Sequence, residues 1–147
     1  MSLHGPIISI EDDDDDQLII SDIIGRLGLP NTVRFFRTGL DALQYLATTP
    51  ETPFLILCDI RMPLMDGIDL RQRINEDDYL RQKAIPFVYY TSTSRTEDLQ
   101  EQVNFAYQLS VQGFFRKASG LEAVEGQLRL IIEYWQNCLH PNSTPSG

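Results

Sequence analysis

The sequence predicts an α/β fold in which five parallel strands form a sheet and five helices cover both of its faces. Three observations predict it. Short apolar runs alternate five times with segments whose apolar residues recur at helical spacing, and the connections between them are short. The run 54–58 is apolar at every position, which is typical of a parallel strand that is buried on both faces.

Five segments are expected to be strands because each is short and rich in apolar, β-branched or aromatic residues. They are 6–10, 32–36, 54–58, 87–90 and 113–115. The third strand ends in a carboxylate, Asp59. Beyond it, Met62-Pro63 stops regular extension and Asp66-Gly67 turns the chain toward the next helix.

The first helix is expected over about 18–27, where Gly28 ends it and Asp15 or Asp16 is placed to cap its start. Four more helices are expected, and the charged segment 75–84 is expected to be a loop. One begins at Gly39 and stops near Pro50, and the next covers about 68–74. A further helix opens at Thr96, and the last runs from about 121 to 138.

The composition indicates one domain that buries a substantial core. The chain has 147 residues, and 42% of them are hydrophobic. We expect the folded domain to span 6–139, between a flexible N-terminus, 1–5, and a flexible tail, 140–147.

Charge and cysteine usage narrow the class of protein. The net charge of −9 comes from 12 basic and 21 acidic residues, and six of the acids are consecutive, at 11–16. The sequence has no basic stripe, so we expect no nucleic-acid partner. Cys58 and Cys138 lack metal-ligand spacing, and neither a signal peptide nor a run of membrane-spanning length is recognisable. We therefore expect a cytoplasmic protein with no membrane partner.

Polar residues follow four of the expected strands, and the carboxyl ends of parallel strands share one edge of a sheet. They are Glu11 and Asp12 after the first strand, Asp59 after the third, Thr91 after the fourth and Lys117 after the fifth. Three carboxylates at one edge repel each other unless a cation lies among them, and an all-oxygen set suits Mg²⁺. A lysine and a hydroxyl at the same edge indicate an anion there as well. Such a set is typical of phosphoryl transfer.

Four motifs occur in a fixed order along the chain. They are the Glu11-Asp12 pair, Asp59 within the segment 59–67, Thr91-Ser92, and Phe114 three residues before Lys117. In this order and at these strand ends they resemble the receiver domains of two-component response regulators, over about 6–139. The resemblance implies a doubly wound, flavodoxin-like sheet with strand order 2-1-3-4-5.

The resemblance implies that Asp59 accepts a phosphoryl group from a sensor histidine kinase or a histidine phosphotransfer protein. Lys117 would pair with the phosphoryl oxygens, and Thr91 would donate a hydrogen bond to them. Movement of Thr91 would let Phe114 turn inward and remodel the surface around the last two helices. The protein would catalyse only its own phosphorylation and slow dephosphorylation. As a stand-alone receiver, it would signal by contact with a downstream protein or by phosphorelay.

The resemblance also implies a Mg²⁺ site. Asp12 and Asp59 would bind the ion directly, Glu11 would bind it through water, and the backbone carbonyl of Arg61 would complete the protein ligands. The family usually has proline after the lysine, commonly with a cis bond, whereas this chain has Ala118. A cis bond before a residue other than proline costs about 2.5–4 kcal/mol, so we expect a trans bond or strain here.

Two other functions fit parts of the pattern. A phosphohydrolase that uses an aspartyl-phosphate commonly has a second Asp two residues after the nucleophile, where this chain has Arg61. A phosphorylation-independent binding module of receiver fold would not use the acidic residues, and the Ala118 departure favours it modestly. A homodimer through the last two helices is a further expectation, since Leu130 and Tyr134 lie off the apolar stripe.

Overall fold

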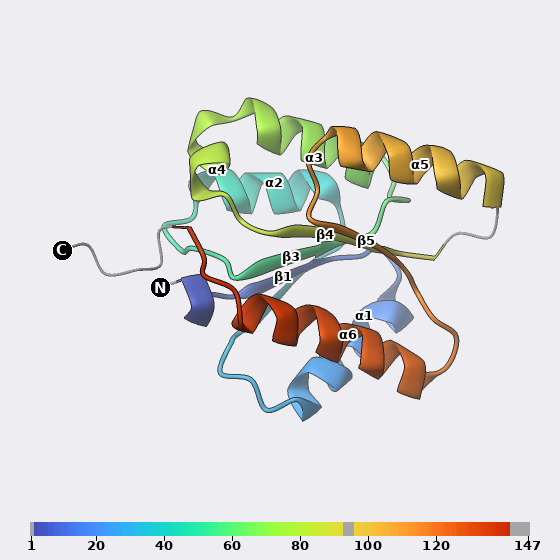
Figure 1. The fold of residues 1–147 in the computed structure, drawn as a ribbon. Helices are drawn as coiled ribbons and strands as arrows, with labels where there is room; N and C mark the ends of the chain where they lie inside the picture. The colour runs from blue at the N-terminus through green and yellow to red at the C-terminus, as the bar shows by residue number, and fades with distance from the viewer. Residues whose placement is uncertain (1, 93–95, 142–147) are drawn as a thin grey trace.

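The computed structural model describes residues 2–92 and 96–141, which form a sheet between two layers of helices (Figure 1). The strands are β1 (Ile7–Ile10), β2 (Val33–Phe36), β3 (Leu55–Cys58), β4 (Phe87–Thr91) and β5 (Gly113–Arg116). The helices are a 3₁₀ turn η1 (Ser2–His4), then α1 (Asp14–Arg26), α2 (Gly39–Thr48), α3 (Gly67–Glu76), α4 (Asp78–Lys83), α5 (Thr96–Gln108) and α6 (Leu121–Gln136). Residues 93–95, which follow the Thr91-Ser92 pair, and residues 142–147 lie outside the described residues.

All neighbouring strands are parallel, and their order is β2-β1-β3-β4-β5. This confirms the expected doubly wound sheet and its strand order. Because β1 lies between β2 and β3, the second strand is added on one side of β1 and the third on its other side. The carboxyl ends of β1 and β3 are therefore adjacent in the middle of the sheet, where ligand sites of such folds occur.

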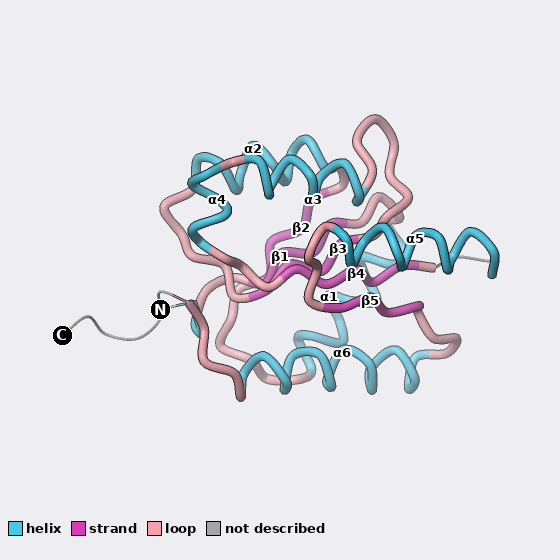
Figure 2. The backbone as a smooth tube through the Cα atoms, turned by 45° about the horizontal axis from the view of Figure 1, so that its top comes forward, coloured by secondary structure: helices cyan, strands magenta, loops and turns pink. Residues whose placement is uncertain are grey.

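Successive side chains of each strand point to opposite faces of the sheet and pack into two separate cores. In β3, Ile56 and Cys58 pack on the face that α2, α3, α4 and α5 cover. Leu55 and Leu57 pack on the other face, which α1 and α6 cover. Figure 2 shows the two helical layers with the sheet between them. Burial on both faces explains why 54–58 is continuously apolar, and Cys58 itself is 1% exposed.

The segment 75–84 is not the loop that its charges suggested. It contains α4, so residues 2–92 and 96–141 form six α-helices where five were expected. The Asp77 side chain caps this helix by accepting a hydrogen bond from the Leu80 amide at 3.1 Å, and Leu80 is 2% exposed. One buried leucine on a capped turn is too short a pattern for helical periodicity to reveal.

The acidic run caps α1 two or three residues earlier than expected. Asp13, and neither Asp15 nor Asp16, is the N-cap, because its Oδ1 accepts a hydrogen bond from the Asp16 amide at 3.0 Å. Asp14, Asp15 and Asp16 then occupy the first turn, where the helix dipole favours negative charge. This cap brings Asp16 to the inner side of the helix start, next to the end of β5.

Side-chain contacts tie both described ends to the folded domain. The Asn31 side chain donates hydrogen bonds to the carbonyls of Leu3 and Gly5 at 3.1 and 2.7 Å. His140, at the start of the expected flexible tail, is 6% exposed and stacks on Phe54 with ring centroids 5.0 Å apart. These contacts join Leu3, Gly5 and His140 to the sheet and its connections, and the expected domain bounds stay a prediction.

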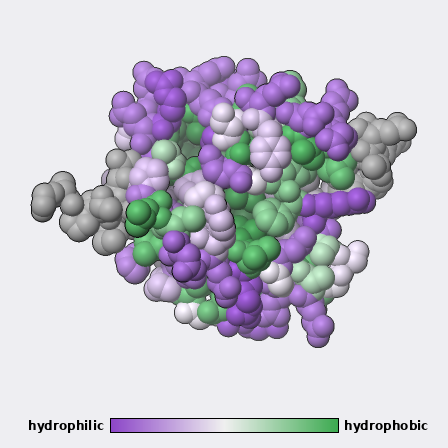
Figure 3. Space-filling model, viewed as in Figure 1, coloured by the Kyte–Doolittle hydropathy of each residue, from purple (hydrophilic) through white to green (hydrophobic). Residues whose placement is uncertain are grey.

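The surface over β5 and the adjacent stretch of α6 is apolar, as the green region near the centre of Figure 3 shows. Leu130 and Tyr134 are 62% and 60% exposed there, beside a cavity of about 260 Å³ that Phe115 and Trp135 help to line. Their exposure agrees with their position off the apolar stripe, and the homodimer stays a prediction. Among the described residues, none of the helices combines the length and apolar character needed to cross a membrane.

Candidate phosphoacceptor site

The site lies where β1 and β3 end side by side. Ile10 and Cys58 are register partners, and the Asp59 amide donates a 3.0 Å hydrogen bond to the Ile10 carbonyl. Asp59 directly follows β3, while Glu11 and Asp12 directly follow β1. The sheet therefore brings together acids that are almost fifty positions apart in the sequence.

Glu11, Asp12 and Asp59 each place a carboxylate oxygen within 4.8 Å of the others. Glu11 and Asp59 are 2% and 6% exposed, and Asp12 is half-buried. Three carboxylates this close and this well shielded from water need compensating positive charge. Oxygen donors of this kind fit Mg²⁺, which takes one or two carboxylates and keeps several waters.

Lys117 supplies part of that charge from the end of β5. Its ammonium lies 2.5 Å from Oε2 of Glu11, 3.0 Å from Oδ2 of Asp16 and 3.9 Å from Oδ2 of Asp59. The backbone amide of Lys117 donates a 2.9 Å hydrogen bond to the Thr91 carbonyl, which extends the β4–β5 pairing by one residue. One ammonium thus faces three carboxylates, and the site as a whole stays negative.

The pKa values reflect this imbalance. Burial raises the pKa of Glu11 to about 8, and the Asp59 charge adds to the shift while the Lys117 hydrogen bond opposes it. Burial lowers the pKa of Lys117, but the hydrogen bond and charge of Glu11, with Asp16 and Asp59, outweigh it and hold that pKa above its ordinary value. Lys117 is therefore charged, and Glu11 binds a proton more readily than an exposed glutamate does.

Thr91 and the chain after Asp59 hold the Asp59 carboxylate from the other side. The Thr91 hydroxyl donates a 2.5 Å hydrogen bond to Oδ1 of Asp59, and the Arg61 amide donates to the same oxygen at 3.3 Å. Thr91 is the last residue of β4 and is 1% exposed, whereas the Arg61 side chain is exposed. The two donors orient Asp59 so that Oδ2 faces Lys117.

A close approach of backbone shapes the segment 59–67. The Gly67 amide donates a 2.8 Å hydrogen bond to the Ile60 carbonyl, and a Cβ on Gly67 would lie 2.5 Å from the Asp59 carbonyl oxygen. The Tyr89 hydroxyl donates a 2.5 Å hydrogen bond to the Gly67 carbonyl. Only glycine fits at position 67, because the turn that the sequence indicated at Asp66-Gly67 folds back onto Asp59 and Ile60.

Phe114 lies apart from the acids, on the face of the sheet that α5 covers. It is half-buried, and its ring centroid is 5.7 Å from that of Tyr89. The structure thus gathers Glu11, Asp12, Asp59, Thr91 and Lys117 as expected. The role of Phe114 as a switch, and that of the Arg61 carbonyl as a metal ligand, stay predictions.

Three residues near Lys117 were missed by the sequence analysis. Asp16 pairs with the ammonium, Tyr90 places its ring 5.9 Å from it, and Gln127 binds the backbone on both sides of it. The sequence predicts Asp16 only as a candidate cap of the first helix. Its position in the first turn of α1, facing the strand ends, was the signal available. For Gln127 no local signal exists, because it is one polar residue on an amphipathic helix.

The fold and the site place the chain among doubly wound α/β proteins with a polar site at the carboxyl ends of the strands. Within that class it belongs to the response regulator receiver domain family, whose model matches residues 7–129. Receiver domains are signalling modules of two-component systems rather than metabolic enzymes, and they interact with histidine kinases or phosphotransfer proteins.

Individual relatives support the family assignment. The probable methanogenesis regulatory protein FilR2 of Methanothrix harundinacea is 29% identical over 133 residues, which cover 88% of this chain and 82% of FilR2. Response regulator Rcp1 of Synechocystis sp. is 28% identical over 134 residues, which cover 88% of this chain and 87% of Rcp1.

Solved structures agree in fold. The phosphorylated cyanobacterial phytochrome response regulator RcpA matches with a TM-score of 0.82 at 25% identity, covering 95% of this chain and 99% of RcpA. The Mn(2+)-bound form of Rcp1 matches with a TM-score of 0.76 at 23% identity, covering 95% of this chain and 98% of Rcp1.

Proposed function

We propose that this chain is a phosphoacceptor whose Asp59 takes a phosphoryl group from a phosphohistidine of a partner protein in a Mg²⁺-dependent reaction. The observation that carries the proposal is the convergence of two acids, a hydroxyl and an ammonium on one oriented carboxylate, in a family of signalling modules. An oxygen of Asp59 attacks the phosphorus, the bond from phosphorus to the histidine nitrogen breaks, and the nitrogen keeps that electron pair.

Each residue around Asp59 has a role in this reaction. Lys117 neutralises charge on the phosphoryl oxygens, and its 3.9 Å distance from Oδ2 of Asp59 leaves room for the group to enter. The Thr91 hydroxyl leaves Oδ1 of Asp59 and donates instead to a phosphoryl oxygen. A cavity of about 420 Å³ lies beside Lys117, between α1 and α6.

Asp12 and Asp59 would hold Mg²⁺ directly, with Glu11 acting through water and the Arg61 carbonyl as a further ligand. The Mn(2+)-bound form of Rcp1 supports a divalent ion in a related protein. When bound, the ion neutralises charge on the transferring phosphoryl group. The carboxylates of this chain bind and orient it, and the burial of Glu11 and Asp59 keeps bulk water from competing.

Movement of the Thr91 side chain would pass the signal to a downstream protein. Once its hydroxyl is drawn to the phosphoryl group, the space beside it opens for the Phe114 ring, which packs on Tyr89 in the unphosphorylated chain. Phenylalanine has no hydroxyl, so packing alone decides this movement. The altered face of α5, β5 and α6 then binds a downstream protein in the cytoplasm, or the phosphoryl group passes onward along a phosphorelay.

Phosphorylation of purified protein tests the proposal. With acetyl phosphate and Mg²⁺ we expect one added phosphoryl group by intact-mass measurement, and none for Asp59→Asn or without Mg²⁺. Absence of the adduct in wild-type protein, also with beryllofluoride as the phosphoryl mimic, would refute it. Partner binding that persists unchanged in Asp59→Ala would then identify the chain as a phosphorylation-independent binding module.

A further inference from the structure

Lys117 lies in the short link between β5 and α6. The strand β5 is at the edge of the sheet and pairs with β4 on one side only. The Lys117 amide donates to the Thr91 carbonyl of β4 at 2.9 Å. The C=O and N–H of one peptide unit face in opposite directions. The Arg116 carbonyl therefore points away from the Lys117 amide of the same unit, and the Ala118 amide points away from the Lys117 carbonyl. The Arg116 carbonyl and the Ala118 amide are thus turned away from β4, at the open edge of the sheet.

The side-chain amide of Gln127 satisfies both groups. Its Nε2 donates a 2.8 Å hydrogen bond to the Arg116 carbonyl, and its Oε1 accepts a 3.0 Å hydrogen bond from the Ala118 amide. One amide therefore pairs with the residues before and after Lys117, as a sixth strand would. The Ala118 N–H is available for this contact because residue 118 is not proline.

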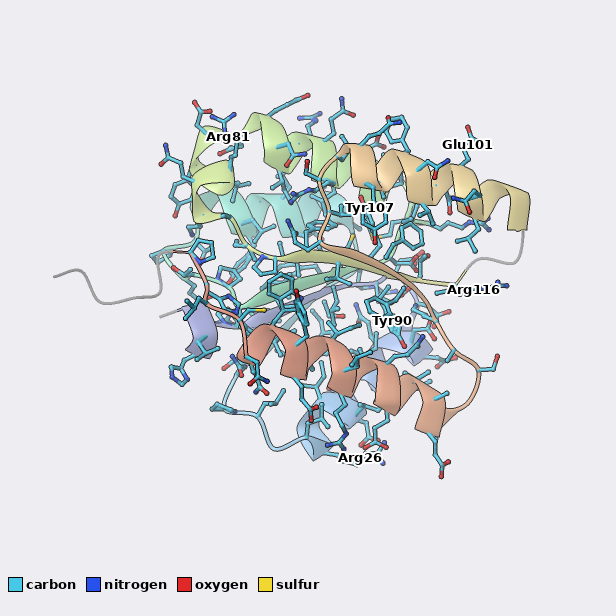
Figure 4. The ribbon with its side chains drawn as sticks, viewed as in Figure 1. Arg26, Arg81, Tyr90, Glu101, Tyr107 and Arg116 are labelled. Atoms are coloured by element: carbon cyan, nitrogen blue, oxygen red, sulfur yellow. The ribbon has the colours of Figure 1, made fainter. Side chains whose placement is uncertain are left out.

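Tyr90 fixes Gln127 in turn. The Tyr90 hydroxyl donates a 2.6 Å hydrogen bond to Oε1 of Gln127, and Tyr90 is 2% exposed. Figure 4 shows Tyr90 reaching from the sheet toward α6, while Arg116 points away from the domain. The same Tyr90 ring lies 5.9 Å from the Lys117 ammonium, within reach of a cation–π interaction.

We propose that Gln127, held by Tyr90, is a positioning residue that sets the place of Lys117 for phosphoryl transfer. The backbone of Lys117 is clamped between the Thr91 carbonyl on one side and the Gln127 amide on the other, so its side chain leaves the sheet at a defined point. From there the ammonium reaches Glu11 and lies near Asp59. This inference rests on the proposed function of Asp59.

The clamp makes a distinct prediction about rates. Gln127→Leu has similar volume but removes both backbone contacts, and we expect the maximal rate of Asp59 phosphorylation by acetyl phosphate to fall about tenfold. The Mg²⁺ dissociation constant should stay within about twofold, because the carboxylates that would hold the ion follow β1 and β3. A purely structural role of Gln127 would weaken both together, or neither.

Gln136→Leu is the matched control, since Gln136 is exposed on the same helix. Tyr90→Phe removes one hydroxyl and leaves the two backbone contacts of Gln127, so we expect a smaller decrease, about threefold. Should Gln127→Leu fail to fold, as judged by circular dichroism, Tyr90→Phe decides the question by the same rate. A wild-type rate in a folded Gln127→Leu variant, or in Tyr90→Phe when the first does not fold, would overturn the proposal.

Hydrogen exchange separates this inference from the proposed function. The Ala118 amide should exchange at least about tenfold faster in Gln127→Leu than in wild-type protein, measured by NMR, because its acceptor is gone. If wild-type protein accepts no phosphoryl group while this amide behaves as expected, the proposed function fails and the clamp stands as structure only. If the amide exchanges equally fast in both proteins, the clamp itself is wrong.

Discussion

The ammonium of Lys117 lies 2.5 Å from Oε2 of Glu11, although 106 positions separate the two residues in the sequence. Glu11 follows β1 and Lys117 follows β5, and these two strands are not neighbours in the sheet. The contact spans the carboxyl edge above β3 and β4 and encloses Asp59 and Thr91. Lys117 therefore neutralises one of the three acids that form the carboxylate cluster.

Lys117→Met should bind Mg²⁺ more tightly than wild-type protein at neutral pH. The ammonium and the ion are attracted to the same carboxylates, so its removal leaves more negative charge for the ion. We expect an affinity gain of about tenfold, which corresponds to 1.4 kcal/mol, by isothermal titration calorimetry. Phosphorylation should nevertheless be lost, because the phosphoryl oxygens lose their positive partner. An unchanged affinity would show that the two cations do not compete.

Asp16→Asn should accelerate phosphorylation. Asp16 draws the Lys117 ammonium toward α1 with a 3.0 Å contact, and its side chain is 36% exposed. A half-exposed ion pair is worth at most about 1 kcal/mol, so releasing Lys117 toward Asp59 should raise the rate by no more than about fivefold. Asp15→Asn is the control, since it removes the same charge from an exposed neighbour in the same turn. Equal rates for the two variants would assign the effect to net charge alone.

Gly67→Ala should destabilise the domain and disturb the site together. The added Cβ would lie 2.5 Å from the Asp59 carbonyl oxygen and 2.9 Å from a ring carbon of Tyr89, so backbone must move. We expect a loss of about 1–3 kcal/mol in the free energy of unfolding, measured with urea. Gly126→Ala in α6 meets no atom within 4 Å and should instead stabilise the helix by about 0.5–1 kcal/mol. A neutral Gly67→Ala would contradict the close approach.

Glu51 should make stability depend on pH below about 5. Arg34 donates to both carboxylate oxygens of Glu51 at 2.8 and 2.7 Å, and Tyr45 donates to one of them. The Arg34 hydrogen bond, followed by that of Tyr45, lowers the pKa of Glu51 below its ordinary 4.5. The unfolded chain then binds the proton more readily, so the contribution is complete above 4.5 and is lost as pH falls through the folded pKa.

Comparison with Glu51→Gln isolates that contribution. The pair is partly exposed, so solvent screening limits it to about 1 kcal/mol at neutral pH. Urea unfolding at pH 7 and pH 3 should show a difference between wild type and variant that shrinks at the lower pH. A difference that is equal at both values would mean that this ion pair does not carry the effect.

The alternation of apolar runs with amphipathic segments predicted a covered parallel sheet, and the polar residues at the strand ends predicted the five residues that meet at the site. Five short apolar runs separated by amphipathic segments admit few arrangements other than a covered parallel sheet, and such a sheet aligns its carboxyl ends. Glu11, Asp12, Asp59, Thr91 and Lys117 all directly follow, or end, a strand. Their meeting therefore follows from backbone topology, which the sequence determines through its hydrophobic periodicity.

Tertiary structure alone decided the contacts that side chains make across elements. Asp16 reaches Lys117, and Gln127 reaches the backbone on both sides of it, because α1 and α6 pack side by side on one face of the sheet. The only local signal for either contact was the place of Asp16 in the first turn of α1. The short helix α4 depends on one cap and one buried leucine. Periodicity reports which face of a helix is apolar, whereas the partner of a single polar side chain depends on how two helices are placed in space. That placement is settled only when the whole core is packed.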